Sequence, residues 1–515
     1  MGEASGARRR ARRVVTRRQT VLLFVGIAAF CAIAFLPSSL QQFVREKTDF
    51  GNRPALAAAT AVLMAWLWIT ESLSIYVTAC IPLVLFPLLA PGGKGPFAEL
   101  GDAVFPYFNA YNFLFLGGMG IAAAMQEWGL HSRVALRILK ATGTQPSRVL
   151  LGMLLATASV SLWISNTATA AMMLPIGLAL IQQIERQSGG ERRIYFGGAL
   201  MLAIAYGANI GGMGTKIGTG PNLIFCGYAA RELRREISFL EFVSLGLPFV
   251  VVFIPIAWWA LWRMGRRDAP VSRIGAEVID ASLRALGPVS RGEKVVLVVF
   301  LCTSTLWILS QPIHAALEPL WKRRFDLKLL SSHVEASVAM LAMLTLLLIP
   351  IGRSGGRGPM ALNVRNFRLI PWETLVLLGG GLSLATAVES SGLAIWMAEQ
   401  LAAFRGAPLF SQFVVVSLFT VGFGAIASNV ATTTVMLPVL KSIAGADALP
   451  LMVTATLAAS CDFALPAGTP PNAIVFGSGY LTIPRMARVG ALLDVIAALL
   501  LSVWGYTGVR WILGA

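Results

Sequence analysis

Two short segments of this chain are near-copies of each other, and both interrupt apolar stretches. Residues 165–175 read SNTATAAMMLP and residues 428–438 read SNVATTTVMLP, with seven of eleven positions identical. A second shared element follows each of them, GTGPN at 218–222 and GTPPN at 468–472. Small polar residues, Gly and Pro break helices, and lipid tolerates broken backbone only where protein or a water-filled cavity satisfies it. Paired interruptions in two halves of a chain are typical of a transporter's binding site.

The composition is that of a protein with many membrane spans. The 515 residues are 56% hydrophobic and 13% charged, against about 25% charged in a typical soluble domain. The formal net charge of +17 gathers at the ends of apolar runs and in an Arg-rich segment over residues 8–18. This distribution follows the positive-inside rule, and no basic stretch is interleaved with stacking aromatics. We therefore expect an integral protein of the bacterial inner (plasma) membrane, in contact with the lipid bilayer and with no nucleic-acid partner.

Hydropathy predicts an all-α membrane protein with about 11 transmembrane helices. The clear spans are 20–37, 55–72, 74–90, 110–126, 243–262, 295–312, 333–350, 372–388 and 487–513. Two re-entrant hairpins, at about 147–184 and 409–443, carry the Ser-Asn segments. Two broken helices, at about 194–228 and 449–480, carry the Gly-Thr elements. With both hairpins treated as re-entrant, most basic loops fall on the side of the N-terminus, which predicts a cytoplasmic N-terminus and an external C-terminus.

The internal repeat extends beyond these motifs. Leu116-Gly117-Gly118 recurs as Leu378-Gly379-Gly380 at the start of each set of elements. Each half holds five spans, an odd number, so the two copies have opposite orientation and form inverted repeats. The expected domains are an Arg-rich cytoplasmic tail at 1–19, a first helix and external loop at 20–54, a first repeat at 55–262, a cytoplasmic connector at 263–294 and a second repeat at 295–515.

These motifs, in this order, resemble the signature of the divalent-anion/sodium symporter family, whose members carry di- and tricarboxylates or sulfate. The resemblance covers the chain from about residue 55 to residue 513. It implies a secondary active transporter of small dianions, above all C4-dicarboxylates such as succinate, malate and fumarate. It also implies coupling to Na+ with no organic cofactor, a homodimer, and an elevator mechanism in which a transport domain moves across a fixed scaffold.

The physics of the motifs agrees with this resemblance. Hairpin tips and broken helices expose unpaired backbone groups, half-helix N-termini favour anions, and free carbonyl oxygens suit a hard cation such as Na+. By position, the resemblance assigns the substrate to Asn166, Thr167, Thr219, Ser428, Asn429, Val430, Thr469 and Pro470. It assigns one sodium ion to Ser161, Ser165, Asn166 and Gly218, and a second to Ala427, Asn429 and Gly468.

Three positions depart from this pattern. Val430 stands where the first segment has Thr167, and Gly424 stands where the first repeat has Ser161, so the second half has fewer side-chain oxygens. Lys216 precedes Gly218 by two residues, where an apolar residue is expected. An ionisable residue at membrane depth is a functional hypothesis, and Lys216 and Asp462 are the two coupling candidates. The simpler interpretations are that Lys216 snorkels to an interface and that Asp462 caps a helix end.

Two alternatives to sodium symport remain open. In a sodium-independent dicarboxylate exchanger, the ammonium of Lys216 would replace the charge of a cation. An anion channel also uses irregular backbone, but an inverted repeat within one chain favours alternating access. No HExxH or GxSxG pattern occurs, and we do not expect an enzyme. The sequence does not choose among succinate, malate, citrate, 2-oxoglutarate and sulfate.

Overall fold

The computed structural model describes residues 17–514 apart from 37–38, 47–50, 71, 90–94, 189–190, 271–275, 353–358, 401–403 and 405. Most of the predicted Arg-rich tail and part of the predicted connector lie outside the described residues. Regular structure in the described part of the chain is helical, and the one bridge between extended segments found there joins Pro350 and Met360. The predicted all-α class is therefore confirmed.

Eight helices in the described residues are long and apolar enough to cross a membrane, and ten if each of two bent pairs counts as one span. The eight cover Arg18–Phe35, Arg53–Thr70, Leu100–Glu127, Asn166–Gln187, Ile194–Gly212, Phe239–Gly265, Ser331–Leu348 and Ile483–Leu513. The bent pairs are α16 and α17, Arg291–Ile308 with Ser310–Phe325, and α19 and α20, Trp372–Ser390 with Leu393–Gln400. One of the eight, Asn166–Gln187, is an arm of the first predicted hairpin, which was not counted among the predicted 11 spans. Four further apolar segments are shorter, two of them arms of the predicted hairpins and two within predicted spans. They are Ile75–Leu89, Pro146–Ser161, Leu409–Gly424 and Ala448–Ala458.

The two halves of the chain run through the same order of elements. The first half comprises α8 (Ala110–Glu127), α9 (Leu130–Thr142), α10 (Pro146–Ser161), α11 (Asn166–Gln187), α12 (Ile194–Gly212), α13 (Gly220–Glu232) and α14 (Phe239–Gly265). The second half comprises α19, α20, α22 (Leu409–Gly424), α23 (Asn429–Ala444), α24 (Ala448–Ala458), α25 (Pro470–Phe476) and α26 (Ile483–Trp504). In both halves a helical hairpin precedes a broken helix, as the sequence predicted.

The remaining elements precede, connect or follow these two sets. They are α2 (Arg17–Phe35), α3 (Ser39–Glu46), α4 (Arg53–Thr70), α5 (Ile75–Ala79), α6 (Ile81–Leu89), η3 (Gly95–Phe97), α7 (Leu100–Val104), η4 (Phe105–Tyr107), α15 (Ala276–Ala285), α16, α17, α18 (Ser331–Leu348), η5 (Val364–Leu369), η6 (Gly445–Asp447), the π-helical η7 (Gly505–Val509) and α27 (Arg510–Leu513).

Each hairpin turns at its Ser-Asn segment, because the serine caps the returning helix. Ser165 precedes α11, and its side chain accepts a hydrogen bond from Ala168 N at 3.4 Å. Ser428 does the same for α23, accepting from Ala431 N at 3.2 Å. A serine at this position satisfies one of the N–H groups that a helix start leaves unpaired. The repeated serine therefore sets the tip of each hairpin.

In each broken helix, the side chain of one asparagine donates hydrogen bonds to backbone carbonyl groups at the break. Asn222 Nδ2 donates to Gly212 O at 2.9 Å and to Thr215 O at 2.7 Å. In the second half, Asn472 Nδ2 donates at the same spacing, to Asp462 O at 2.9 Å and to Leu465 O at 3.0 Å. These amides satisfy carbonyl groups that the end of a helix leaves unpaired. The final Asn of each Gly-Thr element thus has a structural task, which explains why it is repeated.

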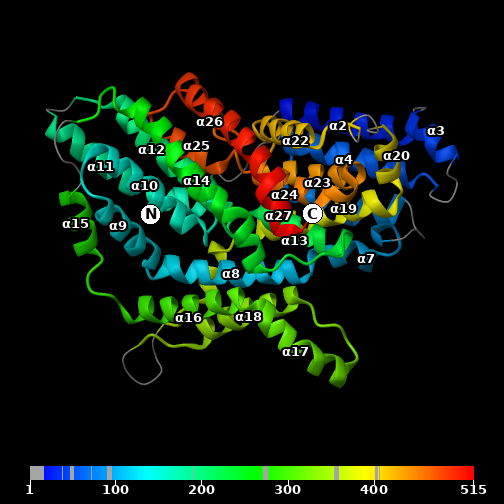
Figure 1. Cartoon of the computed structure of the whole chain (residues 1–515), viewed down its shortest axis with the longest axis horizontal. Coiled ribbons are helices and arrows are strands. Elements are labelled where there is room, and N and C mark those ends of the chain that lie inside the picture. The colour runs from blue at the N-terminus through cyan, green and yellow to red at the C-terminus, as the bar shows by residue number, and fades with distance from the viewer. Residues whose placement is uncertain are drawn as a thin grey trace, which may run out of the picture.

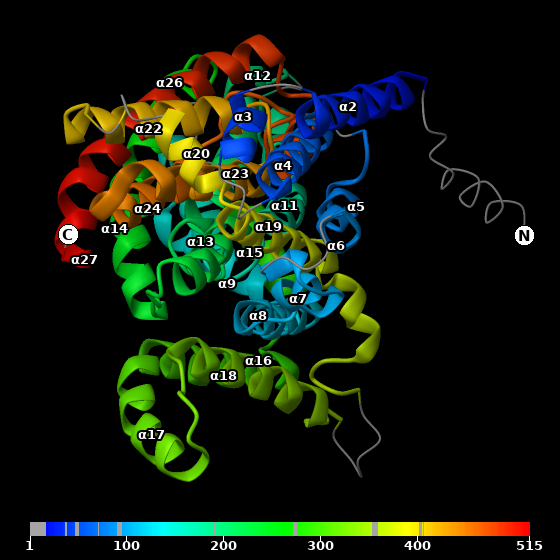
Figure 2. The same cartoon turned by 90° about the vertical axis from the view of Figure 1, so that its right-hand side faces the viewer.

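The core forms around α12, in which every residue from Phe196 to Gly212 is buried. The helices α16, α17 and α18 form a layer on the side of α8 that faces away from α12. They lie below α8 in Figure 1 and also in Figure 2, the view turned by 90°. The helix α18 approaches α8 closely at two glycines. A Cβ built on Gly117 would lie 2.5 Å from the backbone of Ala339, and one on Gly120 would lie 2.6 Å from Met343. Small residues allow such close approach between helices in membranes.

Candidate binding site

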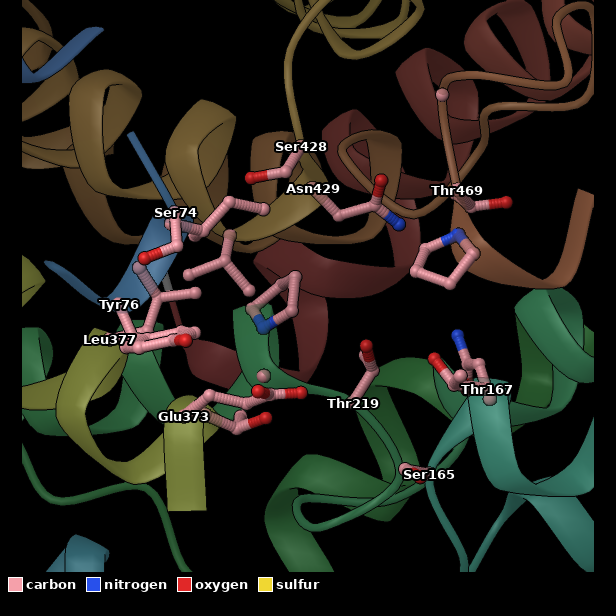
Figure 3. Close-up of a pocket in the computed structure, with 18 of the residues that line it drawn as sticks. Ser74, Tyr76, Ser165, Thr167, Thr219, Glu373, Leu377, Ser428, Asn429 and Thr469 are labelled. Atoms are coloured by element: carbon pink, nitrogen blue, oxygen red, sulfur yellow. The ribbon is translucent and has the colours of Figure 1, made fainter. Parts of the chain in front are cut away.

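A cavity of about 770 Å³ lies where the two hairpin tips meet the two helix breaks. In Figure 3, Ser165, Thr167 and Thr219 lie on one side of it, and Ser428, Asn429 and Thr469 lie on the other. All eight residues that the resemblance assigned to substrate line this cavity: Asn166, Thr167, Thr219, Ser428, Asn429, Val430, Thr469 and Pro470. Segments more than 250 residues apart in the sequence thus form one site.

On the first-repeat side, the hairpin asparagine is fixed in a tight polar arrangement. Ser161 Oγ lies 2.9 Å from Asn166 Oδ1 and 2.7 Å from Ala208 O. Gly212 faces the same amide, because a Cβ built on it would lie 2.4 Å from Asn166 Oδ1. Only glycine at position 212 leaves room for this side chain. Asn166 is therefore positioned by residues of α10 and α12.

The second-repeat side has the same plan with fewer side-chain oxygens. Asn429 occupies the place of Asn166, but Gly424 replaces the serine that would bond to it. The Oδ1 atom of Asn429 is buried and has no hydrogen-bond partner. Asn209 of α12 joins the two halves, because its Nδ2 donates to Thr469 Oγ1 at 3.1 Å. Its own Oδ1 is also buried without a partner.

Neutral polar groups dominate the part of the cavity between the tips. Three helices begin at residues that line the cavity: α11 at Asn166, α13 at Gly220 and α23 at Asn429. The N-terminus of a helix carries partial positive charge and unpaired N–H groups, which favour an anion. The charged side chains in the lining are Arg18 and Glu373, and Figure 3 shows Glu373 on the same side of the cavity as Thr219, across from Ser428 and Thr469. The site can therefore hold an anion without a lysine or arginine at the tips.

The residues assigned to sodium lie at the cavity or directly behind it. Ser165, Asn166, Gly218, Asn429 and Gly468 line the cavity. Ser161 is fully buried behind Asn166, and Ala427 is buried beside the second tip. No group of three or more His, Cys, Asp or Glu side chains in the described residues could hold a metal ion. A cation here would depend mainly on amide, hydroxyl and carbonyl oxygens, which suit a hard cation.

Lys216 does not line the cavity. Its side chain is fully buried, and its Nζ donates to Glu335 Oε2 at 2.5 Å and to Ile237 O at 2.6 Å. The other carboxylate oxygen of Glu335 accepts from Phe239 N at 2.7 Å and from Ser310 Oγ at 3.1 Å. The interpretation that Lys216 snorkels to an interface is therefore wrong. The ammonium of Lys216 is neutralised by a carboxylate of α18.

Asp462 lies in the second break and is fully buried. Neither of its carboxylate oxygens has a hydrogen-bond partner, so the interpretation that its side chain caps a helix end is wrong. A Cβ built on Gly468 would lie 1.8 Å from Asp462 Oδ2, which places this carboxylate against a glycine that lines the cavity. Asp462 thus lies behind Gly468, which lines the cavity.

The structure adds cavity residues that sequence reasoning missed. Asn209, Ser74, Tyr76, Glu373 and Thr374 all contribute to the lining. The only signal for Asn209 was an amide inside an otherwise apolar helix. The other four come from the ends of α5 and α19, far from both motifs, and no pattern marks them in the sequence.

Comparison with known proteins supports the family resemblance. The profile of the family described as "Sodium:sulfate symporter transmembrane region" matches residues 17–513. A protein of Staphylococcus saprophyticus named sodium-dependent dicarboxylate transporter SdcS is 37% identical over 480 residues, covering 91% of this chain and 89% of that protein. The protein of the same name from Staphylococcus aureus is 36% identical over 468 residues, covering 89% of this chain and 86% of that one.

One solved structure shares the fold. The YdaH transporter of Alcanivorax borkumensis, described as having an unusual topology, superposes with a TM-score of 0.50 at 14% sequence identity. The match covers 78% of this chain and 86% of that one. At this identity the likeness concerns the fold alone.

Proposed function

This chain belongs to the family of the sodium:sulfate symporter transmembrane region, an integral membrane transporter family, and we propose that it is a secondary transporter of small dicarboxylates coupled to sodium. The observation that carries the proposal is the single cavity formed by both Ser-Asn tips and both Gly-Thr breaks. The curated relatives of similar length are named sodium-dependent dicarboxylate transporters.

The substrate is a small dianion, with C4-dicarboxylates such as succinate, malate and fumarate as the first choice. Its carboxylates accept hydrogen bonds from the amides of Asn166 and Asn429 and from the hydroxyls of Thr167, Thr219 and Thr469. Hydrogen bonds to a charged group contribute about 1.5–3 kcal/mol each. Two asparagines on opposed tips match two carboxylates at the ends of a short carbon chain.

Sodium ions bind at the two breaks, one in each repeat. The first ion binds to Ser161, Ser165, Asn166 and Gly218, and the second to Ala427, Asn429 and Gly468. Bound cations beside the dianion offset its charge, so substrate and ions bind together. This mutual dependence is the physical origin of coupling.

The pairing of Lys216 favours sodium symport over exchange. In the exchange hypothesis, a free ammonium replaces the cation. Lys216 is instead neutralised by Glu335 at 2.5 Å and does not line the cavity. Its charge is therefore not available to an anion between the tips.

The mechanism we propose is an elevator in a homodimer. The hairpins and broken helices move together and carry the cavity across the membrane, while the other spans stay fixed. The N-terminus is cytoplasmic and the C-terminus external, with the first repeat at 55–262, the second at 295–515 and a cytoplasmic connector at 263–294.

Proteoliposome uptake tests the substrate class. With an inward sodium gradient, purified protein should accumulate labelled succinate, and excess unlabelled malate or fumarate should compete strongly. Stronger competition by sulfate or citrate than by malate would reject C4-dicarboxylates as the main substrates. Absence of any succinate uptake, with sodium-driven sulfate uptake in the same vesicles, would reject dicarboxylate transport altogether.

A further inference from the structure

Asp462 presents a buried carboxylate that nothing in the described structure compensates. Its side chain is 0% exposed, and both oxygens lack a hydrogen-bond partner. None of the ion pairs in the described part of the chain includes it. A buried charge is costly unless it is paired, hydrogen-bonded or bound to a metal ion. This carboxylate therefore points to a ligand.

The internal repeat shows where this side chain is directed. Gly212 lies six residues before Gly218, and Asp462 lies six residues before Gly468. Both backbone carbonyls accept from the asparagine of their own break, so the two positions are structural equivalents. A side chain built on Gly212 would meet Asn166 Oδ1 at 2.4 Å. By this correspondence, a side chain at position 462 is expected to extend toward the second hairpin asparagine, Asn429.

A second unpartnered oxygen lies at the tip of the second hairpin. Asn429, the counterpart of Asn166, also has a buried Oδ1 without a partner. Gly468 lies against the Asp462 carboxylate, because a Cβ there would lie 1.8 Å from Oδ2 and 2.3 Å from Oδ1. Carboxylate, amide and backbone carbonyl oxygens are the ligands that suit a hard cation, and the second break and the second tip supply all three kinds.

The neighbouring charges do not compensate Asp462. Asp494 of α26 accepts from Phe463 N at 2.9 Å and from Ala464 N at 3.1 Å, so its oxygens are satisfied by the backbone that follows Asp462. A second carboxylate nearby adds negative potential. Lys216, in the first break, is held by Glu335. The partner of this carboxylate therefore has to come from solution.

We propose that Asp462 is a direct carboxylate ligand of the cation bound at the second break. The carboxylate takes over the place left by Gly424, which lacks the hydroxyl that Ser161 supplies in the first half. The inference rests on the proposed function and deepens it. The second site is then anionic before substrate arrives, whereas the first site is built from neutral oxygens.

A consequence is that the second site binds sodium without the dianion. A site built from neutral oxygens gains most of its attraction for a cation when the anion is present. A site with its own carboxylate attracts the cation beforehand. Sodium bound to the folded protein raises its thermal stability by mass action, so binding can be followed without transport.

The test is a sodium titration of thermal stability on the purified full-length protein in detergent, without dicarboxylate. Choline chloride replaces sodium chloride to hold ionic strength constant. Asp462→Asn keeps the side-chain volume and removes the charge, and Asp494→Asn is the matched control. We expect the sodium concentration for half-maximal stabilisation to rise about tenfold or more in Asp462→Asn and to stay within about twofold in Asp494→Asn.

An unchanged midpoint in Asp462→Asn, the result expected if Asp462 holds a proton instead, overturns the proposal. So does an equal rise in Asp494→Asn. If Asp462→Asn does not fold, Gly424→Ser replaces it, since a Cβ there would meet only Ala459 O, at 3.7 Å. The added hydroxyl should lower the midpoint about threefold, and an unchanged midpoint contradicts the cation site.

The result also separates this inference from the proposed function. If the wild type shows sodium-driven succinate uptake and Asp462→Asn leaves the sodium midpoint of thermal stability unchanged, the proposed function stands and Asp462 is not a cation ligand. If the sodium midpoint depends on Asp462 but the protein takes up no dicarboxylate, Asp462 remains a cation ligand and the proposed substrate class is rejected.

Discussion

At the scale of single residues, the two hairpin asparagines are the main proposed contacts to the substrate. Asn166→Ala and Asn429→Ala each remove an amide that would donate to a buried carboxylate, a bond worth about 1.5–3 kcal/mol. We expect the concentration of succinate for half-maximal uptake to rise about tenfold to a hundredfold in each variant. The measurement is initial uptake in proteoliposomes against succinate concentration.

Asn363→Ala is the matched control for these variants. Asn363 is exposed, caps η5 through Arg365 N at 3.0 Å and does not line the cavity. Its uptake should equal that of the wild type. Normal uptake by folded Asn166→Ala and Asn429→Ala would show that the anion binds elsewhere.

The pair of Lys216 and Glu335 predicts a characteristic double-mutant cycle. Removing one partner of a buried ion pair costs about 3–5 kcal/mol, because the other charge stays buried and unpaired. Lys216→Met and Glu335→Leu should each lower the melting temperature clearly, and the double variant should recover most of the loss. Equal losses that simply add in the double variant would contradict the pairing.

The same cycle bears on coupling. If Lys216 serves structure alone, uptake by the double variant should require sodium as the wild type does. Sodium-independent uptake by the wild type, with a new sodium requirement in the double variant, would instead favour the exchange hypothesis.

Sequence reasoning located the cavity residues better than it explained the ionisable ones. The eight substrate positions came from the family resemblance, which the repeated motifs locate on this chain, and all eight line the cavity. The partner of Lys216 could not be predicted, since Glu335 lies 119 residues away and only packing of α18 brings it close. For the same reason the isolation of Asp462 became visible only in the folded chain.

At the scale of elements, the broken helices depend on close backbone approach. A Cβ built on Gly218 would lie 2.5 Å from Gly212 O, which is backbone and cannot rotate away. Gly218→Ala should therefore displace the break and reduce uptake at least about tenfold, as misplacement near a site does. The measurement is uptake per mass of reconstituted protein.

Gly422→Ala in α22 is the control for that change. Nothing lies within 4 Å of a Cβ at this position, and alanine is preferred to glycine in a helix by roughly 0.5–1 kcal/mol. Uptake by Gly422→Ala should match the wild type. Full activity in Gly218→Ala would show that the break tolerates a shift and does not position the site.

The hairpins predict opposite accessibility of their open ends. In a background without the five native cysteines, Gln187→Cys marks the end of the first hairpin and Ala407→Cys the start of the second. In intact cells, an impermeant thiol reagent should label Ala407→Cys from outside and should label Gln187→Cys only after the membrane is opened. Labelling of both from the same side is incompatible with inverted repeats.

The elements themselves were largely predictable from the sequence. Apolar runs bounded by charges marked the long helices, and α16 and α18 begin and end within a few residues of their predicted limits. The sequence predicted a single span over 74–90, whereas the chain forms α5 and α6 with a turn at Cys80. Hydropathy does not detect such a turn, because its residues are as apolar as a continuous helix.

At the scale of the whole molecule, one chain builds a single site from two copies of the same plan. The Ser caps, the asparagine clamps and the Gly-Thr breaks recur with the same local contacts. Two such halves in opposite orientation suit alternating access, because the site can face either side with equivalent geometry. Motion of the transport part and dimer formation are proposals that rest on the family resemblance.

The central claim, that dicarboxylate transport is driven by sodium, is tested most directly by uptake into empty proteoliposomes. Vesicles containing the purified protein and no internal dicarboxylate are diluted into labelled succinate, either with sodium outside or with choline in its place. We predict accumulation with the inward sodium gradient and none in choline. Uptake that ignores sodium and appears only when the vesicles are loaded with unlabelled dicarboxylate would contradict the claim and identify an exchanger.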